Sequence, residues 1–242
     1  MRGAMGRQAD RFHVPGARHG ARRQVPPGLG RFQPLAKRIA GWVFAWHAHL
    51  KVRGREHLPA TGPVIVAANH RSMLDIPLLV VACPRPVFLM AKADLYTNPV
   101  LGRFFHELGG FPVRRQIADV RALDSALALL ERGEVVGIYP EGTRSKSGDM
   151  LPFLGGAAWL ALRTGAPIVP CGLVGTAGPY AARDPVTLTR WQRWWHALAP
   201  RRVTITYGPA IAVDKEPRAA VRRQRMGELS ERLLTDIAAL AR

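Results

Sequence analysis

The sequence predicts an α/β fold, a single domain with a largely parallel central sheet flanked by helices and an interfacial helix at its N-terminal side. The first observation is that short apolar runs, typical of buried strands, alternate with segments of helical periodicity. The second is that Gly133 and Gly165 follow two of the helical segments, where a helix naturally stops. Strands that alternate with helices pair in parallel through crossover connections, so we expect one folded domain over residues 51–242.

The expected strands are apolar runs bounded by glycine, proline or charged residues, and they cover 64–68, 86–91, 110–114, 134–139, 167–174 and 203–207. The expected helices cover 76–82, 98–108, 118–132, 156–164 and, at the end of the chain, 216–242. The helix at 118–132 is predicted most clearly, by an apolar stripe at helical spacing: Val120, Leu123, Leu127 and Leu130. A similar stripe runs along the last helix: Met226, Leu229, Leu233, Ile237 and Leu240.

Residues 1–33 are expected to form a disordered basic tail. Residues 1–38 carry nine arginines or lysines against one acid, Asp10, and glycine and proline recur among them. Such a composition buries too little apolar surface to offset the entropy lost on ordering.

Residues 34–50 form the expected N-terminal helix. Its stretch without formal charge, Ile39 to Leu50, is well short of the ~20 residues that span a bilayer. Apolar and aromatic residues share one face of it: Ile39, Trp42, Val43 and Trp46. This face suits the plane of a membrane surface, and it equally suits packing on the domain's own core. The sequence leaves both alternatives open.

The formal net charge of +18 calls for an anionic partner, and charge alone does not distinguish nucleic acid from anionic lipid. Residues 190–202 carry three tryptophans among four arginines. They suit a lipid headgroup interface, a stacking platform for single-stranded nucleic acid, or a surface loop held to the core by its tryptophans. The sequence contains no helix-turn-helix, aromatic RNA-binding strand or zinc pattern, so we expect no nucleic-acid partner.

The two cysteines, Cys83 and Cys171, are too few for a disulfide framework and too isolated for a metal site. They suit a reducing cytosol and ordinary positions in the core.

The segment Asn69–Asp75 places an imidazole and a carboxylate five positions apart, just beyond an apolar run. A neutral histidine can remove a proton from an alcohol, and a carboxylate can hold the other ring nitrogen in the correct tautomer. Open α/β sheets build their sites at the carboxyl ends of strands, which is where His70 and Asp75 fall. The alternative is structural: Asp75 begins the next helix as an N-cap, or pairs with Ser72 in an arrangement like a capping box.

Two further segments suit an anionic ligand. The turn at 139–145 offers two small residues and Arg144, a combination that fits a cluster of anionic oxygens. The strand at 110–114 is followed by Arg115, and the adjacent side chains of Arg114 and Arg115 point to opposite faces. One of these two arginines can therefore face the ligand edge of the sheet, where its planar fork grips phosphate.

Taken in order, these segments resemble the 1-acylglycerol-3-phosphate O-acyltransferases, the lysophosphatidate acyltransferase branch of the glycerolipid acyltransferases. Asn69, His70 and Asp75 match the family's Asn-His-x-x-x-x-Asp block, and 139–145 matches Phe-Pro-Glu-Gly-Thr-Arg-Ser with Tyr139 in place of Phe. Two further blocks match in order: the glycine-containing strand that ends in arginine, at 110–115, and the apolar segment centred on proline, at 166–170. The four blocks in this order are highly specific, and residues 91–95 also resemble the family's lysine-containing segment. The likeness covers roughly residues 52–210.

The resemblance implies that His70 is the general base and Asp75 its orienting partner. It implies that the acceptor's phosphate and glycerol are bound by a second set of residues: Arg115, Glu141, Gly142, Thr143, Arg144 and Lys92. The segment 153–156 lacks the lysines often found after this block, and Arg114 replaces a frequent acidic residue. Both departures concern the headgroup rather than the reaction.

The resemblance implies acyl transfer from acyl-CoA or acyl carrier protein to the free hydroxyl of 1-acylglycerol-3-phosphate, making phosphatidic acid in phospholipid biosynthesis. Glycerol-3-phosphate or another lysophospholipid would undergo the same chemistry, and the sequence does not fix the acyl chain length. We expect no metal and no cofactor. No covalent acyl-enzyme is required, because the acceptor hydroxyl is itself the nucleophile. Since the acceptor is a lipid, we expect an anionic membrane surface as partner and peripheral or monotopic attachment to the cytoplasmic face of the cell membrane. A basic nucleic-acid-binding protein is the alternative from another class, and it leaves His70 and Asp75 unexplained.

Overall fold

The computed structural model describes residues 34–35, 37–38, 41–42, 49–72, 74–92, 97, 99, 102–103, 109–113, 120–145, 149–176 and 202–242. The strands among them are β1 (Lys51–Arg53), β2 (Val64–Ala68), β3 (Val87–Lys92), β4 (Gly110–Val113), β5 (Val135–Ile138), β6 (Ile168–Val174) and β7 (Thr204–Tyr207). The helices are η2 (Arg55–His57), α3 (Asp75–Ala82), α5 (Val120–Glu131), α6 (Gly156–Thr164) and α8 (Ala219–Leu240).

The seven strands form one sheet in the order β1-β7-β6-β2-β5-β3-β4. The pairs β2–β5, β2–β6, β3–β5, β3–β4 and β1–β7 are parallel, and β6–β7 is antiparallel. The predicted α/β fold with a largely parallel sheet is therefore confirmed. All six predicted strands are present, with ends that differ by one residue at most. The additional strand β1 has charged residues at both ends and only Val52 between them, so it carries no apolar run to signal it.

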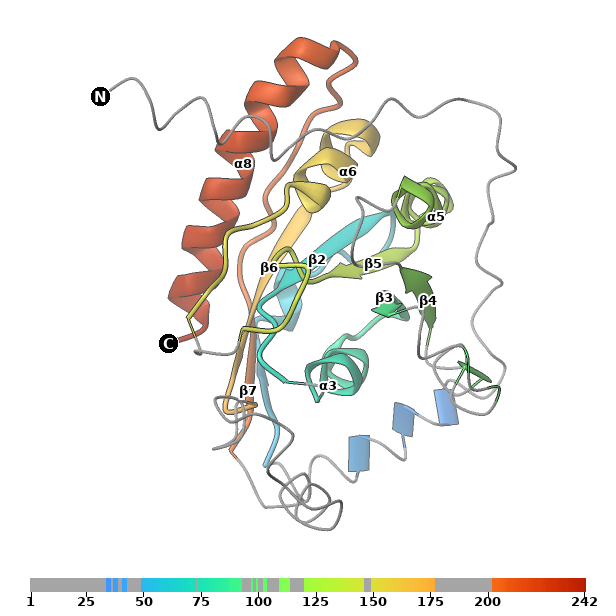
Figure 1. The fold of residues 1–242 in the computed structure, drawn as a ribbon. Helices are drawn as coiled ribbons and strands as arrows, with labels where there is room; N and C mark the ends of the chain where they lie inside the picture. Colours follow the sequence, from blue (N-terminus) through green and yellow to red (C-terminus); the bar gives the residue numbers. More distant parts are fainter. Residues whose placement is uncertain are drawn as a thin grey trace.

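The helices cover the sheet in two layers, with α3 on one face and α5, α6 and α8 on the other (Figure 1). Strand β2 serves both layers, because successive side chains of a strand point to opposite faces. Ile65 and Ala67 pack in the cluster with α5, α6 and α8, and Val64 packs in the cluster with α3. All five residues of β2 are buried, which explains why this strand reads as a continuous apolar run.

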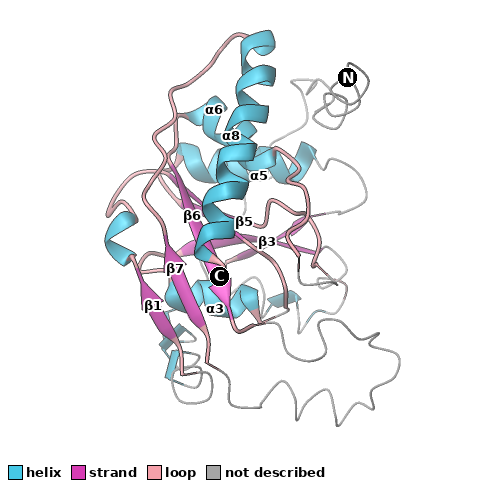
Figure 2. Ribbon diagram, turned by 90° about the vertical axis from the view of Figure 1, so that its left-hand side faces the viewer, coloured by secondary structure: helices cyan, strands magenta, loops and turns pink. Residues whose placement is uncertain are grey.

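The last helix, α8, lies along the face of the sheet near β6 and β7 (Figure 2). Met226, Leu233 and Ile237 of its predicted stripe are buried in the core, and each such side chain contributes ~1.5–3 kcal/mol. The predicted helices at 76–82, 118–132 and 156–164 are confirmed by α3, α5 and α6. Of the predicted helix at 98–108, residues 99, 102 and 103 are helical and all the others lie outside the described residues.

The N-terminal segment is helical at residues 34–35, 37–38 and 41–42, and its described side chains face two ways. Lys37 Nζ donates a hydrogen bond to the Cys83 carbonyl, and Gly41 lies against Val81, so one side packs on the end of α3. Leu35 and Trp42 are 57% and 71% exposed. Residues 35 and 42 are seven apart and 37 and 41 are four apart, which places the two pairs on opposite faces of a helix. Residues 1–33 and the segment 190–201 lie outside the described residues.

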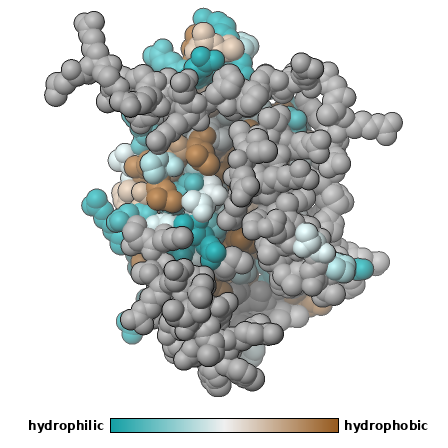
Figure 3. Space-filling view, viewed as in Figure 1, coloured by the Kyte–Doolittle hydropathy of each residue, from teal (hydrophilic) through white to brown (hydrophobic). Residues whose placement is uncertain are grey.

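No helix in the described part of the chain is both long and apolar enough to cross a membrane. On the face seen in Figure 3, apolar side chains of the described residues reach the surface in separate groups among hydrophilic ones.

Candidate active site

The candidate active site lies at a point of the sheet where two neighbouring strands send the chain to opposite faces. Strand β2 leads into α3 on one face, and its neighbour β5 leads toward α6 on the other (Figure 1). Such a divergence opens a crevice at the carboxyl ends of the strands, where ligands of open α/β sheets bind. His70 comes two residues after β2, and Tyr139 comes directly after β5.

His70 and Asp75 form a buried pair. The His70 Nδ1 atom lies 2.9 Å from Asp75 Oδ2, and the two side chains are 1% and 0% exposed. The same oxygen accepts hydrogen bonds of 2.7 Å from the backbone N–H groups of Arg71 and Ser72. The backbone of the loop therefore holds the carboxylate, and the carboxylate holds the imidazole.

The structure combines the two alternatives considered for Asp75. Asp75 is the first residue of α3, and Leu74 occupies the N-cap position without a side-chain hydrogen bond, so Asp75 is not the N-cap. The bond from the Ser72 N–H to Asp75 is one half of a capping box. The other half is missing, because the Ser72 hydroxyl accepts from the N–H of Leu74 instead. One carboxylate thus stabilises the helix start and contacts the histidine.

The two outer atoms of the pair remain available. His70 Nε2 and Asp75 Oδ1 are buried, and neither has a hydrogen-bond partner among the described residues. With the carboxylate at Nδ1, a neutral imidazole carries its proton on that nitrogen and presents a lone pair at Nε2. This is the protonation state that a general base requires.

Asn69 anchors the start of the loop to the neighbouring strand. Its side chain is fully buried; its amide donates to the Leu173 carbonyl at 3.0 Å and accepts from the Leu173 N–H at 2.7 Å. The two bonds imitate a backbone pairing just beyond the last β2–β6 register pair, Ala68 with Cys171. The backbone position directly before His70 is therefore fixed relative to the sheet.

Tyr139 stacks on His70, with ring centroids 4.2 Å apart and an angle of 21° between the ring planes. Its hydroxyl is buried without a hydrogen-bond partner among the described residues. Burial raises the pKa of Tyr139 well above its ordinary value, and the nearby charge of Asp75 raises it further. The phenol therefore stays neutral at physiological pH, and its ring limits how the imidazole can turn.

Glu141 joins this loop to the turn after β5. Its carboxylate is 4% exposed, and it accepts hydrogen bonds from the N–H groups of His70 at 2.9 Å and Leu151 at 3.0 Å. The resemblance places Glu141 among the acceptor-binding residues. In the structure, both oxygens of Glu141 accept from backbone N–H groups.

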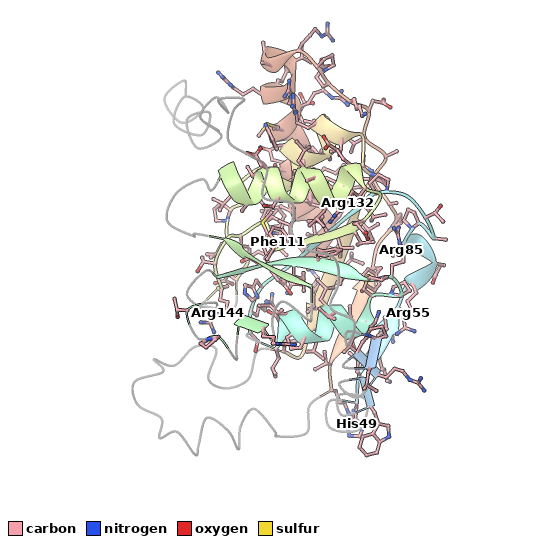
Figure 4. The ribbon with its side chains drawn as sticks, turned by 90° about the vertical axis from the view of Figure 1, so that its right-hand side faces the viewer. His49, Arg55, Arg85, Phe111, Arg132 and Arg144 are labelled. Carbon is pink, nitrogen blue, oxygen red and sulfur yellow. The ribbon has the colours of Figure 1, made fainter. Side chains whose placement is uncertain are left out.

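The remaining residues of the turn are open to solvent. Gly142 has φ 66°, a conformation that glycine adopts without strain, and Thr143 and Arg144 after it are exposed. In Figure 4, Arg144 lies on the opposite side of the molecule from Arg85, which holds the amino edge of the sheet through the Pro59 and Gly133 carbonyls. Lys92 ends β3, but its side chain lies outside the described residues, as does Arg115.

The buried thiols have no part in this arrangement. Burial raises the pKa of Cys171 well above its ordinary value and raises that of Cys83, so both stay neutral at physiological pH. The described residues include no group of three histidine, cysteine or acidic side chains placed to hold a metal ion.

Comparison with known proteins identifies the family. The family model named Acyltransferase matches residues 49–174, which include both loops of the site. The chain belongs to the Acyltransferase family.

Relatives of the chain include the 1-acyl-sn-glycerol-3-phosphate acyltransferase of Bacillus subtilis (strain 168), 34% identical over 134 residues. That alignment covers 55% of this chain and 66% of the relative. The chloroplastic enzyme BAT2 of Brassica napus, which carries the same activity name, is 36% identical over 128 residues, 52% of this chain and 37% of the relative. The chain thus spans less than two thirds of the length of these curated relatives.

The fold of the chain is shared by a solved structure, the 1-acyl-sn-glycerophosphate (LPA) acyltransferase PlsC from Thermotoga maritima. The two superpose with a TM-score of 0.62 and 24% sequence identity, over 86% of this chain and 80% of the other. The likeness extends the match beyond residues 49–174 and confirms the overall fold.

Sequence reasoning brought together His70 and Asp75 correctly, and it placed the turn at 139–145 beside them. It did not predict the structural roles of Asn69 and Tyr139, the hydrogen bonds to Leu173 and the stacking on His70. Both residues entered the sequence analysis only as members of motifs matched to the acyltransferase family. The signals available were an amide directly after a buried strand and an aromatic ring directly after its neighbour, both at the edge where the site forms.

Proposed function

We propose that this acyltransferase moves an acyl group from an acyl thioester to the free hydroxyl of 1-acylglycerol-3-phosphate, making phosphatidic acid. The observation that carries the proposal is the buried His70–Asp75 pair with an unengaged Nε2, beside a turn that exposes Thr143 and Arg144. A base next to an anion-binding turn suits an acceptor that carries both a hydroxyl and a phosphate. The names of the relatives support the same acceptor.

The reaction follows from the positions of the two side chains. His70 Nε2 takes the proton of the glycerol hydroxyl while the hydroxyl oxygen attacks the thioester carbonyl. The resulting tetrahedral intermediate expels the thiolate, which takes the proton back from the imidazolium, so an ester and a free thiol are formed. A general base of this kind contributes ~10²–10⁴-fold to the rate, and Asp75 stabilises the imidazolium.

The acceptor hydroxyl is the nucleophile, so no acyl-enzyme is needed. The neutral, buried thiols of Cys83 and Cys171 agree with this route, because an unionised thiol is a poor nucleophile. The donor is acyl-CoA or acyl carrier protein, and the chemistry at His70 is the same for both.

For the phosphate of the acceptor, we propose Arg144 and Arg115 as the principal ligands, with Lys92 as a third cation. A guanidinium binds phosphate through two parallel hydrogen bonds, and the exposed Arg144 is free to turn toward it. Gly142 and Thr143 add the backbone of a turn that can approach an anion closely. Glycerol-3-phosphate and other lysophospholipids share this phosphate, so the assay below includes them.

An assay with purified protein tests the function. The protein is incubated with labelled acyl-CoA or acyl carrier protein and a panel of acceptors: 1-acylglycerol-3-phosphate, glycerol-3-phosphate, lysophosphatidylcholine and lysophosphatidylethanolamine. We expect labelled phosphatidic acid from the first acceptor and at least tenfold less product from the others. Product from another acceptor alone would reassign the substrate, and no product with any pair would contradict the proposed reaction.

We further propose that the protein attaches peripherally to the cytoplasmic face of the cell membrane through residues 1–50, aided by 190–202. The support is the N-terminal helix, where Lys37 and Gly41 face the domain and Leu35 and Trp42 face outward. Beside the site, Leu154 is 61% exposed and lies over Gly142, so an apolar side chain also borders the acceptor turn.

Vesicle co-sedimentation tests the attachment. Each basic residue near an anionic surface contributes about 1 kcal/mol, and buried aromatic area adds a contribution that salt does not screen. We expect high salt to release the full chain only partly from anionic vesicles, and deletion of residues 1–50 to release most of it. Equal pelleting of both chains would contradict the anchor, and binding to nucleic acid without binding to lipid would contradict the membrane partner.

A further inference from the structure

The carboxylate of Glu141 connects two parts of the site that are distant in sequence. One oxygen accepts from the N–H of His70, 71 positions away, and the other accepts from the N–H of Leu151, 10 positions away. Hydrogen bonds to an ionised acceptor are shorter and stronger than neutral ones, so this side chain is a firm link.

The backbone of His70 is held from both sides by the same turn. Its N–H donates to Glu141, and its carbonyl accepts from the N–H of Ser145 at 3.1 Å. Between these two contact points lie Thr143 and Arg144, the exposed residues proposed to meet the acceptor's phosphate. Any movement of this turn therefore moves the peptide groups that carry the imidazole.

The same geometry argues against Glu141 as a ligand of the acceptor. At 4% exposure the carboxylate offers almost no surface to a substrate, and both oxygens are engaged. An ionised carboxylate would also repel the phosphate that the neighbouring arginine is placed to attract.

We propose that Glu141 is a positioning residue that couples phosphate binding at the Thr143–Arg144 turn to the placement of His70 Nε2. The inference rests on the proposed acyl transfer, and it assigns Glu141 a role on the turnover step rather than on acceptor affinity. When the phosphate draws Arg144 into place, Glu141 and Ser145 transmit the position of the turn to the base. A misplacement of the base by about 1 Å costs on the order of 10²-fold in rate, so a small shift of the turn is enough to change kcat.

The first test is steady-state kinetics of Glu141→Gln and Glu141→Ala with 1-acylglycerol-3-phosphate as acceptor. We expect kcat to fall about tenfold in Glu141→Gln, whose amide oxygen can still accept one N–H, and about a hundredfold in Glu141→Ala. KM for the acceptor should change less than about threefold in both. Glu228→Gln, on the exposed side of α8, is the matched control and should leave kcat and KM unchanged.

The second test is a double-mutant cycle that a merely structural role would not affect. If Glu141 transmits the turn's position, Arg144→Ala should lower kcat and raise acceptor KM in the wild-type background, and only raise KM in the Glu141→Gln background. Fully additive effects on kcat would contradict the coupling, as would Glu141→Gln kinetics equal to wild type.

A tenfold rise in acceptor KM with unchanged kcat in Glu141→Gln would make Glu141 a ligand and overturn the proposal. Because Glu141→Ala loses buried hydrogen bonds and can fold poorly, the decision rests on Glu141→Gln, with its melting temperature measured alongside. A wild-type chain without acyl transfer would contradict the proposed function, which separates that failure from failure of this inference.

Discussion

The two halves of the site differ in how firmly the protein holds them. On the base half, His70 and Asp75 are 1% and 0% exposed, and Asp75 is bound to two backbone N–H groups. On the acceptor half, Thr143 and Arg144 are exposed. Under the proposed function, this difference means that the protein sets the geometry of proton transfer in advance and leaves phosphate binding to exposed side chains. Changes on the base half should therefore act on kcat, and changes on the acceptor half chiefly on KM, with a smaller effect on kcat through Glu141.

The largest effect is expected from His70→Ala. Loss of the base should lower kcat by at least about 10²-fold, because no neighbouring described group replaces Nε2. The variant's circular dichroism and melting curve should stay close to those of the wild type, which shows that the loss is chemical. Residual activity above about a tenth of wild type would contradict the contrast between the two halves, because His70 would then not be the general base.

Arg144→Ala tests the open half. Loss of a charge-assisted phosphate contact should cost roughly 1.5–3 kcal/mol, which raises KM for the lysophospholipid about ten- to a hundredfold. KM for the thioester, measured at saturating acceptor, is the internal control and should change little. A rise confined to the thioester would mean that this arginine binds phosphates of the donor instead.

Four weakly acidic side chains buried in the core on the α3 side of the sheet predict a loss of stability at high pH. Burial raises the pKa values of Cys83, Cys171, Tyr139 and Tyr207 above their ordinary values of 9.0 and 10.0. Above about pH 9 the unfolded chain releases thiol protons that the folded chain retains, so the free energy of unfolding falls as the pH rises. Each such group removes up to about 1.4 kcal/mol per pH unit.

Urea unfolding at pH 7, 9 and 10 measures this loss. The stability of Cys171→Ala should fall less steeply above pH 9 than that of the wild type, because one of the four acids is gone. Parallel curves for the two proteins would show that Cys171 ionises equally in both states.

The smallest effect is expected from Tyr139→Phe. The substitution keeps the ring on His70 and removes a buried hydroxyl without a described partner, so kcat should stay within about twofold and stability should be equal or higher by about 1 kcal/mol. Tyr139→Leu is the paired variant, which loses the stacked ring. A greater loss of activity in Tyr139→Phe than in Tyr139→Leu would show that the hydroxyl, rather than the stack, supports the base.

The fold was predictable because its signals are local. The fully buried β2 reads as an uninterrupted apolar run, and Gly133 and Gly165, with φ 81° and 75°, follow α5 and α6 where predicted. Strand β1 was not predictable, because it pairs through its backbone with β7, far along the chain, and carries charged side chains at both ends.

In the candidate site, the local contact between His70 and Asp75 was predictable, and the contacts between residues distant in sequence were not. The five-residue spacing of His70 and Asp75 implies their contact, which the structure confirms at 2.9 Å. The bonds of Glu141 to His70 and of Asn69 to Leu173 span 71 and 104 positions. Contacts over such separations depend on the order of strands in the sheet, and no local pattern encodes that order.

The most direct test of the account is the kcat of Asp75→Asn in the acyl transfer assay. The amide keeps the size of the carboxylate, and its one oxygen can still accept from the N–H groups of Arg71 and Ser72 and from His70 Nδ1, but it carries no charge to stabilise the imidazolium that forms during the reaction. We expect kcat to fall roughly ten- to a hundredfold, because a hydrogen bond to a charged group contributes ~1.5–3 kcal/mol, with the fold and melting temperature nearly unchanged. An unchanged kcat would mean that Asp75 serves only the start of α3, and it would contradict the assignment of the buried pair as the base.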